Sequence, residues 1–195
     1  MKVFISGGSK SGKSFYAQQL SQKIRKEGTP LYYLATMIPT DDEDELRIAR
    51  HRKEREGCGF ETVEVGCDVV AAVDRCDKRG TFLLDSVTAL LSNVMFAPGD
   101  GEMSELSDGV TPEYHVNHDA HVKTATDLTE IMGRLDNIVI ISDYIYSDAF
   151  LYDELTEAYR RSLAYIDKLV AHCSDVVLEF CAGNCITHKG AEWIV

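Results

Sequence analysis

The feature that most constrains this chain is a glycine-rich octapeptide near its start, GGSKSGKS at residues 7–14. It satisfies the pattern G-x-x-x-x-G-K-[ST], in which glycines let the backbone turn its N–H groups inward around phosphates. In that pattern Lys13 reaches the β- and γ-phosphates and the Ser14 hydroxyl ligates Mg²⁺. An apolar run precedes the loop and a helical apolar pattern follows it, which is the context the motif requires. The loop therefore predicts a site for ATP or GTP, in contact with Gly7, Gly8, Ser9, Lys10, Ser11, Gly12, Lys13 and Ser14.

The rest of the chain alternates between short apolar runs and helical patterns. Strands are expected at residues 2–6, 30–36, 81–85, 137–142 and 175–181, with a weaker edge strand at 61–65. Helices are expected at residues 14–24, 41–56, 68–74, 87–96, 121–135 and 153–172, the second beginning at a capping box formed by Thr40 and Glu43. This alternation predicts a P-loop nucleotide-binding α/β fold, with a mostly parallel sheet and helices on both faces. We expect one domain over residues 1–195, with a polar mobile loop at 97–119.

Composition narrows the classes of function. A net charge of -12 disfavours a nucleic-acid binder, which needs a basic face. No apolar run is long enough to span a membrane, and no leader sequence opens the chain, so a cytoplasmic protein is expected. The six cysteines lack the spacing of a zinc site and are interpreted as reduced thiols. The histidines at positions 115, 118 and 121 are interpreted as surface residues.

An enzyme of this kind also needs an acidic group near the magnesium ion. Asp85 and Asp143 each follow an apolar strand, so either can serve, or can simply cap the next helix. Asp85 is favoured because it closes the cleaner strand and a helix follows it directly.

Residues 47–55, RIARHRKER, concentrate positive charge in an acidic chain. Arg47, His51 and Arg55 lie four residues apart and would share one helical face. Such a face could hold an anion while a neutral histidine attacks phosphorus, with the cations stabilising the developing charge. The alternative is a solvated helix that pairs with the acids at residues 41–45.

Five segments in order extend this interpretation: GGSKSGKS, YLAT followed by DDE, RIARHRKER, TVE and LLDSVTALLSNVMF. Together they resemble the bifunctional adenosylcobinamide kinase / adenosylcobinamide-phosphate guanylyltransferase family of cobalamin biosynthesis and salvage. The likeness covers residues 1–96 best.

The resemblance implies a kinase for the aminopropanol hydroxyl of adenosylcobinamide, with a corrinoid as substrate and GTP and ATP as nucleotides. It implies transfer of GMP from GTP to the new phosphate through a GMP-histidine intermediate. The catalytic residues it implies are His51 and Lys13, and the metal ligands are Ser14 and Asp85 for Mg²⁺. Beyond the glycine-rich loop, the implied nucleotide contacts are Ala35, Thr36, Met37, Arg52, Lys53, Glu54, Arg55, Glu64 and Asp85.

The second half departs from the family pattern. Residues 142–146 read SDYIY where the family carries T-N-E-V-G, and residues 164–168 read AYIDK where it carries G-R-x-N-Q. These stretches are expected to serve the corrinoid or a subunit contact, and a homo-oligomer is expected. Two other functions stay open. One is a generic small-molecule or nucleoside kinase, in which the 47–55 helix is a lid and His51 is not a nucleophile. The other is a non-catalytic nucleotide-dependent regulator.

Overall fold

The computed structural model describes residues 1–39, 42–97 and 116–193, with the side chains at 44, 47, 51 and 54 also left outside the description. In this part of the chain seven strands form one sheet in the order β3-β2-β4-β5-β1-β6-β7. The strands are β1 (Lys2–Gly7), β2 (Leu31–Ala35), β3 (Glu61–Glu64), β4 (Thr81–Asp85), β5 (Asn137–Asp143), β6 (Val176–Cys181) and β7 (Asn184–Lys189). The helices are α1 (Lys13–Ile24), α2 (Asp42–Glu54), α3 (Val69–Asp74), α4 (Val87–Met95), α5 (Ala120–Arg134), α6 (Glu154–Cys173) and the short 3₁₀ turn η1 (Ala191–Trp193).

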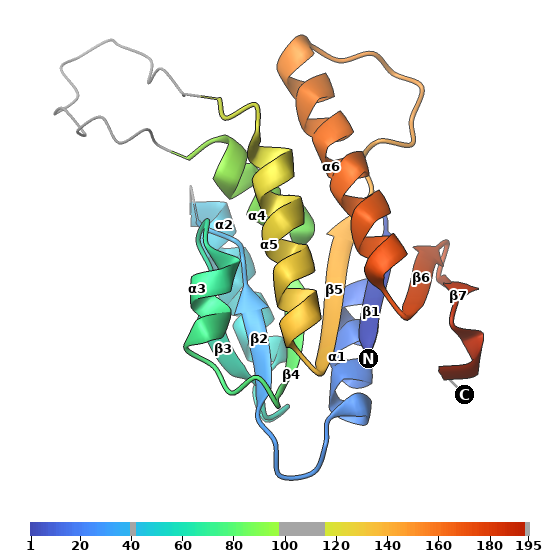
Figure 1. The fold of residues 1–195 in the computed structure, drawn as a ribbon. Helices are drawn as coiled ribbons and strands as arrows, with labels where there is room; N and C mark the ends of the chain where they lie inside the picture. Colours follow the sequence, from blue (N-terminus) through green and yellow to red (C-terminus); the bar gives the residue numbers. More distant parts are fainter. Residues whose placement is uncertain (40–41, 98–115, 194–195) are drawn as a thin grey trace, which may run out of the picture.

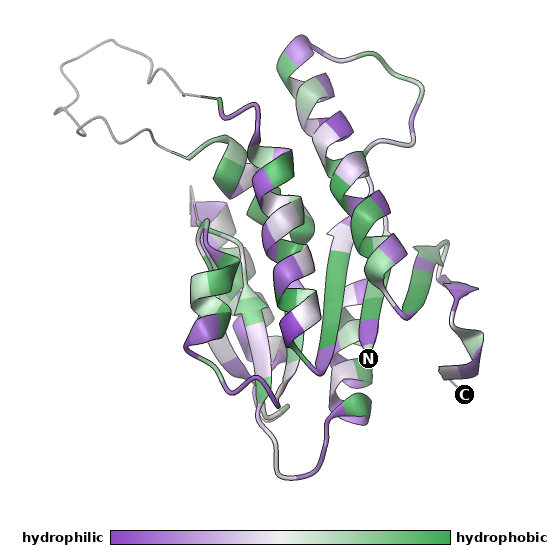
Figure 2. Ribbon diagram, in the orientation of Figure 1, coloured by the Kyte–Doolittle hydropathy of each residue, from purple (hydrophilic) through white to green (hydrophobic). Residues whose placement is uncertain are grey.

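Both faces of the sheet are covered, as the alternation of elements predicts. Side chains alternate along each strand, so Phe4 packs with α3 to α6 on one face, while Val3 and Ile5 pack with α1 on the other. Figure 1 shows α5 and α6 in front of the sheet and α1 behind it. The central strands are hydrophobic along most of their length, whereas the helices mix hydrophobic and hydrophilic residues (Figure 2). The predicted fold class, an α/β fold with a mostly parallel sheet, is therefore confirmed.

The parallel strands end at one edge of the sheet, and their register brings distant residues side by side. Gly7 at the end of β1 pairs with Asp143 at the end of β5. Ala35 at the end of β2 likewise pairs with Asp85 at the end of β4. The start of the glycine-rich loop and both candidate acids therefore meet at the carboxyl edge, where open α/β sheets bind ligands.

One strand was missed by the sequence interpretation, which placed the last strand at 175–181. β7 runs antiparallel to β6 at the edge of the sheet, after a turn at Ala182 and Gly183 with φ of 50° and 76°. Every residue of β7 is exposed, so its sequence NCITHK carries no hydrophobic alternation that would mark it. Of the other expectations, most of the loop at 97–119 and the cap at Thr40 lie outside the described residues. None of the described helices combines the length and apolar character needed to cross a membrane.

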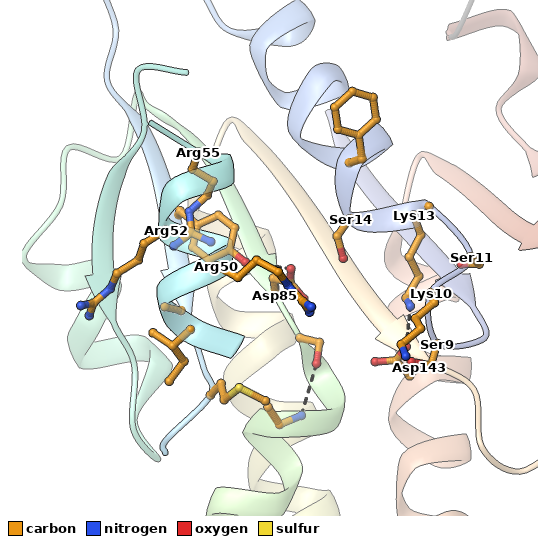
Figure 3. Close-up of a pocket in the computed structure, with 18 of the residues that line it drawn as sticks. Ser9, Lys10, Ser11, Lys13, Ser14, Arg50, Arg52, Arg55, Asp85 and Asp143 are labelled. Carbon is orange, nitrogen blue, oxygen red and sulfur yellow. Dashed lines mark hydrogen bonds and ion pairs between the residues drawn. The ribbon is translucent and has the colours of Figure 1, made fainter. Parts of the chain in front are cut away.

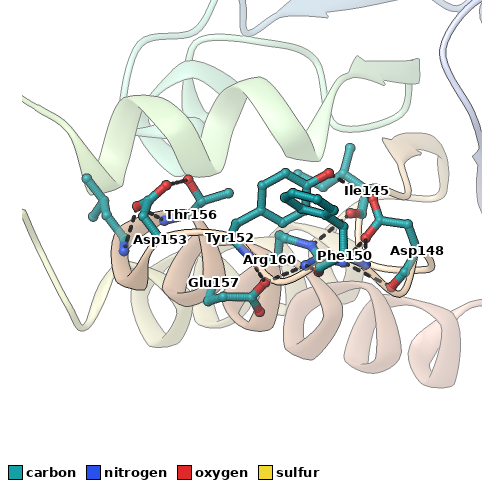
Figure 4. A network of polar contacts seen from close by, with 9 residues as sticks. Ile145, Asp148, Phe150, Tyr152, Asp153, Thr156, Glu157 and Arg160 are labelled. Carbon is teal, nitrogen blue, oxygen red and sulfur yellow. Dashed lines mark hydrogen bonds and ion pairs between the residues drawn. The ribbon is translucent and has the colours of Figure 1, made fainter.

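A buried arginine fastens the loop between β5 and α6 to α6 itself (Figure 4). Arg160 is only 6% exposed. Its Nη2 lies 2.8 Å from Asp148 Oδ1, its Nε donates to the Ile145 carbonyl at 3.0 Å, and it also pairs with Glu157. Asp153 caps the helix by accepting from two backbone N–H groups of its first turn. The loop is thus held by charge-assisted hydrogen bonds from one side chain.

We expect Arg160→Met to lower the free energy of unfolding by about 2–4 kcal/mol, because it leaves carboxylates and carbonyls without their shared donor. Urea denaturation measures the change. Arg161→Met, at the exposed neighbouring position, is the matched control and should change stability by less than about 0.5 kcal/mol. Equal stability of the two variants would show that the Arg160 network contributes nothing.

Candidate nucleotide-binding site

A cavity of about 910 Å³ opens at the carboxyl edge of the sheet, between the glycine-rich loop and α2. Figure 3 shows the loop on one side with Asp143 beside it, the arginines 50, 52 and 55 on the other, and Asp85 between them. The predicted site residues that line it are Ser9, Lys10, Ser11, Gly12, Lys13, Ser14, Ala35, Met37, Arg52, Arg55, Glu64 and Asp85.

Two glycines set the backbone shape of the loop. Gly12 has a φ of 91°, the left-handed region that glycine adopts at little cost, and it forms the N-cap of α1. At Gly7 any Cβ atom would lie 2.8 Å from the Phe180 carbonyl oxygen, so only glycine fits there. Gly12, as the N-cap residue, makes no side-chain hydrogen bond to the first turn of α1, and free N–H groups at a helix start suit an anion.

Lys13 is held inside the cavity by a partner from a distant part of the chain. The residue is 5% exposed, and its Nζ donates to the Gly8 carbonyl at 3.1 Å and forms an ion pair with Asp143. The backbone N–H of Asp143 donates in turn to Thr88 Oγ1 at 3.0 Å. In this structure the Lys13 ammonium group, which the motif assigns to phosphate, is therefore paired with the Asp143 carboxylate.

Asp85 lies in the same cavity with a different neighbour. The Tyr33 hydroxyl, an uncharged donor, donates to Asp85 Oδ2 at 2.8 Å and orients the carboxylate. Among the described residues no group of three or more His, Cys, Asp or Glu side chains could hold a metal. A magnesium ion here would therefore rely on nucleotide phosphates together with oxygen ligands such as Ser14 and Asp85, which is how Mg²⁺ commonly binds.

The two acids can be separated by titration with magnesium. We expect Asp85→Asn to raise the Mg²⁺ concentration needed for half-maximal GTP binding at least about tenfold, because the substitution removes an anionic oxygen ligand. Asp143→Asn should shift that concentration less than about threefold, since Asp85 and not Asp143 is the predicted metal ligand. Calorimetry at several Mg²⁺ concentrations measures both, and the reverse ranking would assign the metal to Asp143.

The α2 side of the cavity is basic. Arg55, just beyond the end of α2, is 7% exposed and places its guanidinium 3.6 Å from the centroid of the Tyr33 ring. Its buried Nε has no hydrogen-bond partner among the described residues. Arg52 forms an exposed ion pair with Glu64 at 2.8 Å, and Arg50 points toward Asp85 (Figure 3). The cavity therefore has a positive wall opposite the phosphate loop.

Several predicted site residues lie elsewhere. Gly7, Gly8, Thr36 and Lys53 do not line the cavity. The Thr36 hydroxyl instead joins β2 to the start of α4, accepting from the Ser86 N–H at 2.7 Å and donating to its carbonyl at 2.9 Å. His51 and Glu54 are residues of α2, but their side chains lie outside the described part of the structure.

The sequence interpretation also missed part of the lining, and the missed side chains carry little motif signal. The lining residues that it did not assign to the site are Phe15, Tyr33, Glu43, Leu46, Ile48, Arg50, Ser86, Ala89 and, as a nucleotide contact, Asp143. Phe15 and Leu46 are 68% and 72% exposed. These two give the cavity apolar surface at which a base could pack.

Comparisons with known proteins agree with the geometry. A family model described as "Cobinamide kinase / cobinamide phosphate guanyltransferase" matches residues 3–187. The "Bifunctional adenosylcobalamin biosynthesis protein CobU" of Salmonella typhimurium is 27% identical over 127 residues, covering 64% of this chain and 67% of that protein.

Among solved structures, a protein from Pyrococcus horikoshii OT3 described as "Structural study of Project ID PH0250" superposes with a TM-score of 0.51 at 10% identity. The match covers 97% of this chain and 86% of that one. At this identity the likeness bears on the fold alone. The flagellar accessory protein FlaH from Methanocaldococcus jannaschii is a further match, with a TM-score of 0.47 at 12% identity, covering 96% of this chain and 77% of that one.

Proposed function

The chain belongs to the cobinamide kinase / cobinamide phosphate guanyltransferase family, and we propose that it carries out both reactions. It would phosphorylate the hydroxyl of adenosylcobinamide with a nucleoside triphosphate, then transfer GMP from GTP to that phosphate. The observation that carries the proposal is the cavity itself, in which a phosphate loop with a buried lysine faces the helix that contains His51.

In the proposed complex the triphosphate lies against the loop and the N-terminus of α1. Lys13 leaves Asp143 and binds the β- and γ-phosphates, as phosphate is the more highly charged partner. Ser14 and Asp85 supply oxygen ligands for Mg²⁺, which offsets the phosphate charge when bound. Phe15 and Leu46 pack against the base.

In the kinase step the acceptor hydroxyl oxygen attacks the γ-phosphorus. The new O–P bond forms as the bond to the β,γ-bridging oxygen breaks, and the nucleoside diphosphate leaves. Asp143, freed from Lys13, is the carboxylate we assign to accept the proton of that hydroxyl.

In the guanylyl step a neutral imidazole nitrogen of His51 attacks the α-phosphorus of GTP and pyrophosphate leaves. A phosphate oxygen of cobinamide phosphate then attacks the same phosphorus, the P–N bond breaks, and the histidine is regenerated. Arg50, Arg52 and Arg55 line the cavity and would stabilise the charge on the phosphates.

A second function fits one specific observation. Arg55 is buried in the cavity wall on a tyrosine ring, a placement that also suits an arginine lid over a transferred γ-phosphoryl group. In that case the chain is a kinase for another small molecule and His51 is not a nucleophile.

Product analysis separates the two functions. The protein is incubated with adenosylcobinamide, GTP and Mg²⁺, and corrinoid products are resolved by chromatography while pyrophosphate is assayed. The proposal expects cobinamide phosphate first, then its guanylylated product with one pyrophosphate released for each. Phosphorylated corrinoid without pyrophosphate would support the cobinamide kinase step alone. An unchanged corrinoid would contradict both steps and favour the kinase for another small molecule.

A further inference from the structure

A second cavity, of about 540 Å³, lies on the face of the sheet that α6 covers. Its floor is formed by β1 and β6, including Ser6 and Val177, and one wall is α6, with Asp167. Tyr144 and Tyr146, from the loop after β5, complete it. It shares no lining residue with the nucleotide cavity, and its lining includes members of the stretches 142–146 and 164–168 that were expected to serve the corrinoid or a subunit contact.

Asp167 is the unusual side chain of this cavity. It is 3% exposed, and its Oδ2 accepts hydrogen bonds from the Ser142 hydroxyl at 3.0 Å and the Tyr146 hydroxyl at 2.9 Å. Its other oxygen, Oδ1, is buried and has no hydrogen-bond partner among the described residues. A buried acceptor without a donor is costly, so this carboxylate can gain from a donor bound in the cavity.

The charges around Asp167 define what that partner can be. Burial raises the pKa of Asp167 to about 7, and the nearby Asp143 carboxylate acts in the same direction. Burial also raises the pKa of Tyr146, so its hydroxyl stays protonated as a donor to Asp167. Of the other charged residues that line the cavity, Glu179 pairs with His188 at 2.7 Å and Lys168 is exposed on α6.

We propose that this cavity is a second ligand site, for a small primary amine whose ammonium group pairs with the Asp167 carboxylate and whose apolar part lies against Tyr144 and Tyr146. An ammonium has three N–H donors and no acceptor, so it suits a carboxylate that has no cationic partner among the described residues. Aromatic rings beside the carboxylate also attract a cation. The volume is in the range of small-molecule sites.

The site is next to the nucleotide cavity along the chain, although the two are separate. Ser142, which binds Asp167, is followed by Asp143, which binds Lys13. Ser6, in the floor of the second cavity, is followed by Gly7 of the phosphate loop. This inference stands independently of the proposed reactions, because it depends on the cavity and Asp167 alone.

Benzylamine is the probe, with benzamide and benzyl alcohol as matched neutral compounds, and binding to the full chain is measured by calorimetry and amide chemical shifts. Above neutral pH benzylamine should bind the wild type at millimolar concentration or better, and at least about tenfold more tightly than either neutral compound. Below about pH 7 its affinity should fall about tenfold per pH unit, because the proton and the amine compete for Asp167.

Asp167→Asn should weaken benzylamine binding at least about tenfold, whereas Glu154→Gln, an exposed carboxylate on the same helix, should not change it. A readout on the wild type keeps the test decisive if the variant folds poorly. The ¹³C resonance of the Asp167 carboxyl should titrate at lower pH when benzylamine saturates the site. An unchanged titration, equal binding by Asp167→Asn, or benzamide binding as tightly as benzylamine would overturn the proposal.

Discussion

Replacement of Lys13 by alanine is expected to weaken the binding of both GTP and ATP at least about 100-fold, roughly 2.8 kcal/mol. The ammonium group is buried in the cavity and is the cation that the loop motif places on the β- and γ-phosphates. The fold should persist, because the lysine pairs with Asp143 at the cavity surface and not with the apolar core. Asp143, whose side chain is 27% exposed, can be hydrated when its partner is removed.

Calorimetry with each nucleotide measures this effect, and a thermal melt checks that the variant is folded. Lys23→Ala is the matched control, because Lys23 lies in the last turn of the same helix and is exposed away from the cavity. Nucleotide affinities that are the same in the Lys13 and Lys23 variants would remove the basis for the phosphate site.

Replacement of His51 by alanine is expected to abolish covalent labelling of the protein by α-labelled GTP, a loss of at least about 1,000-fold, because a nucleophile has no substitute in the step it performs. Binding of GTP should stay within about tenfold, since the ring acts in chemistry more than in affinity. In the wild type the labelling rate should fall as the solution is acidified, because a protonated ring has no lone pair for the attack.

His172→Ala, at an exposed position of α6, is the control and should label as the wild type does. Labelling that persists in the His51 variant would make α2 an anion-binding lid, and the kinase-only function would then be the better account.

The glycine-rich loop was predicted from a motif that is contiguous in the chain, whereas Ala35, Met37, Arg52, Arg55 and Glu64 were predicted as nucleotide contacts only through the family resemblance. The glycine-rich loop and its helix need only local order, so eight adjacent residues specify their own geometry. Tertiary contacts were harder to predict. The ion pair of Lys13 with Asp143 depends on β5 lying between β4 and β1, an order that hydrophobic periodicity does not encode.

Side chains without motif chemistry were also missed for physical reasons. Tyr33 belongs to a buried strand and looks like a core residue, yet its ring supports Arg55 and its hydroxyl orients Asp85. From the sequence, Asp167 looks like an exposed residue on the polar face of a long helix. Its contacts with Ser142 and Tyr146 could not be predicted, since those residues are far from it in the sequence. Packing between distant elements, and not local propensity, decides such positions.

Two-isotope labelling of the wild-type protein tests the central claim most directly. The protein is incubated with Mg²⁺ and GTP labelled either at the α- or at the γ-phosphate, and the denatured chain is analysed by mass spectrometry and peptide mapping. The account predicts label from the α-position only, one GMP per chain on the peptide that contains His51, released by acid and stable in alkali, as expected of a phosphoramidate. Label from the γ-position, or no covalent label from either, would contradict the guanylyl-transfer half of the account.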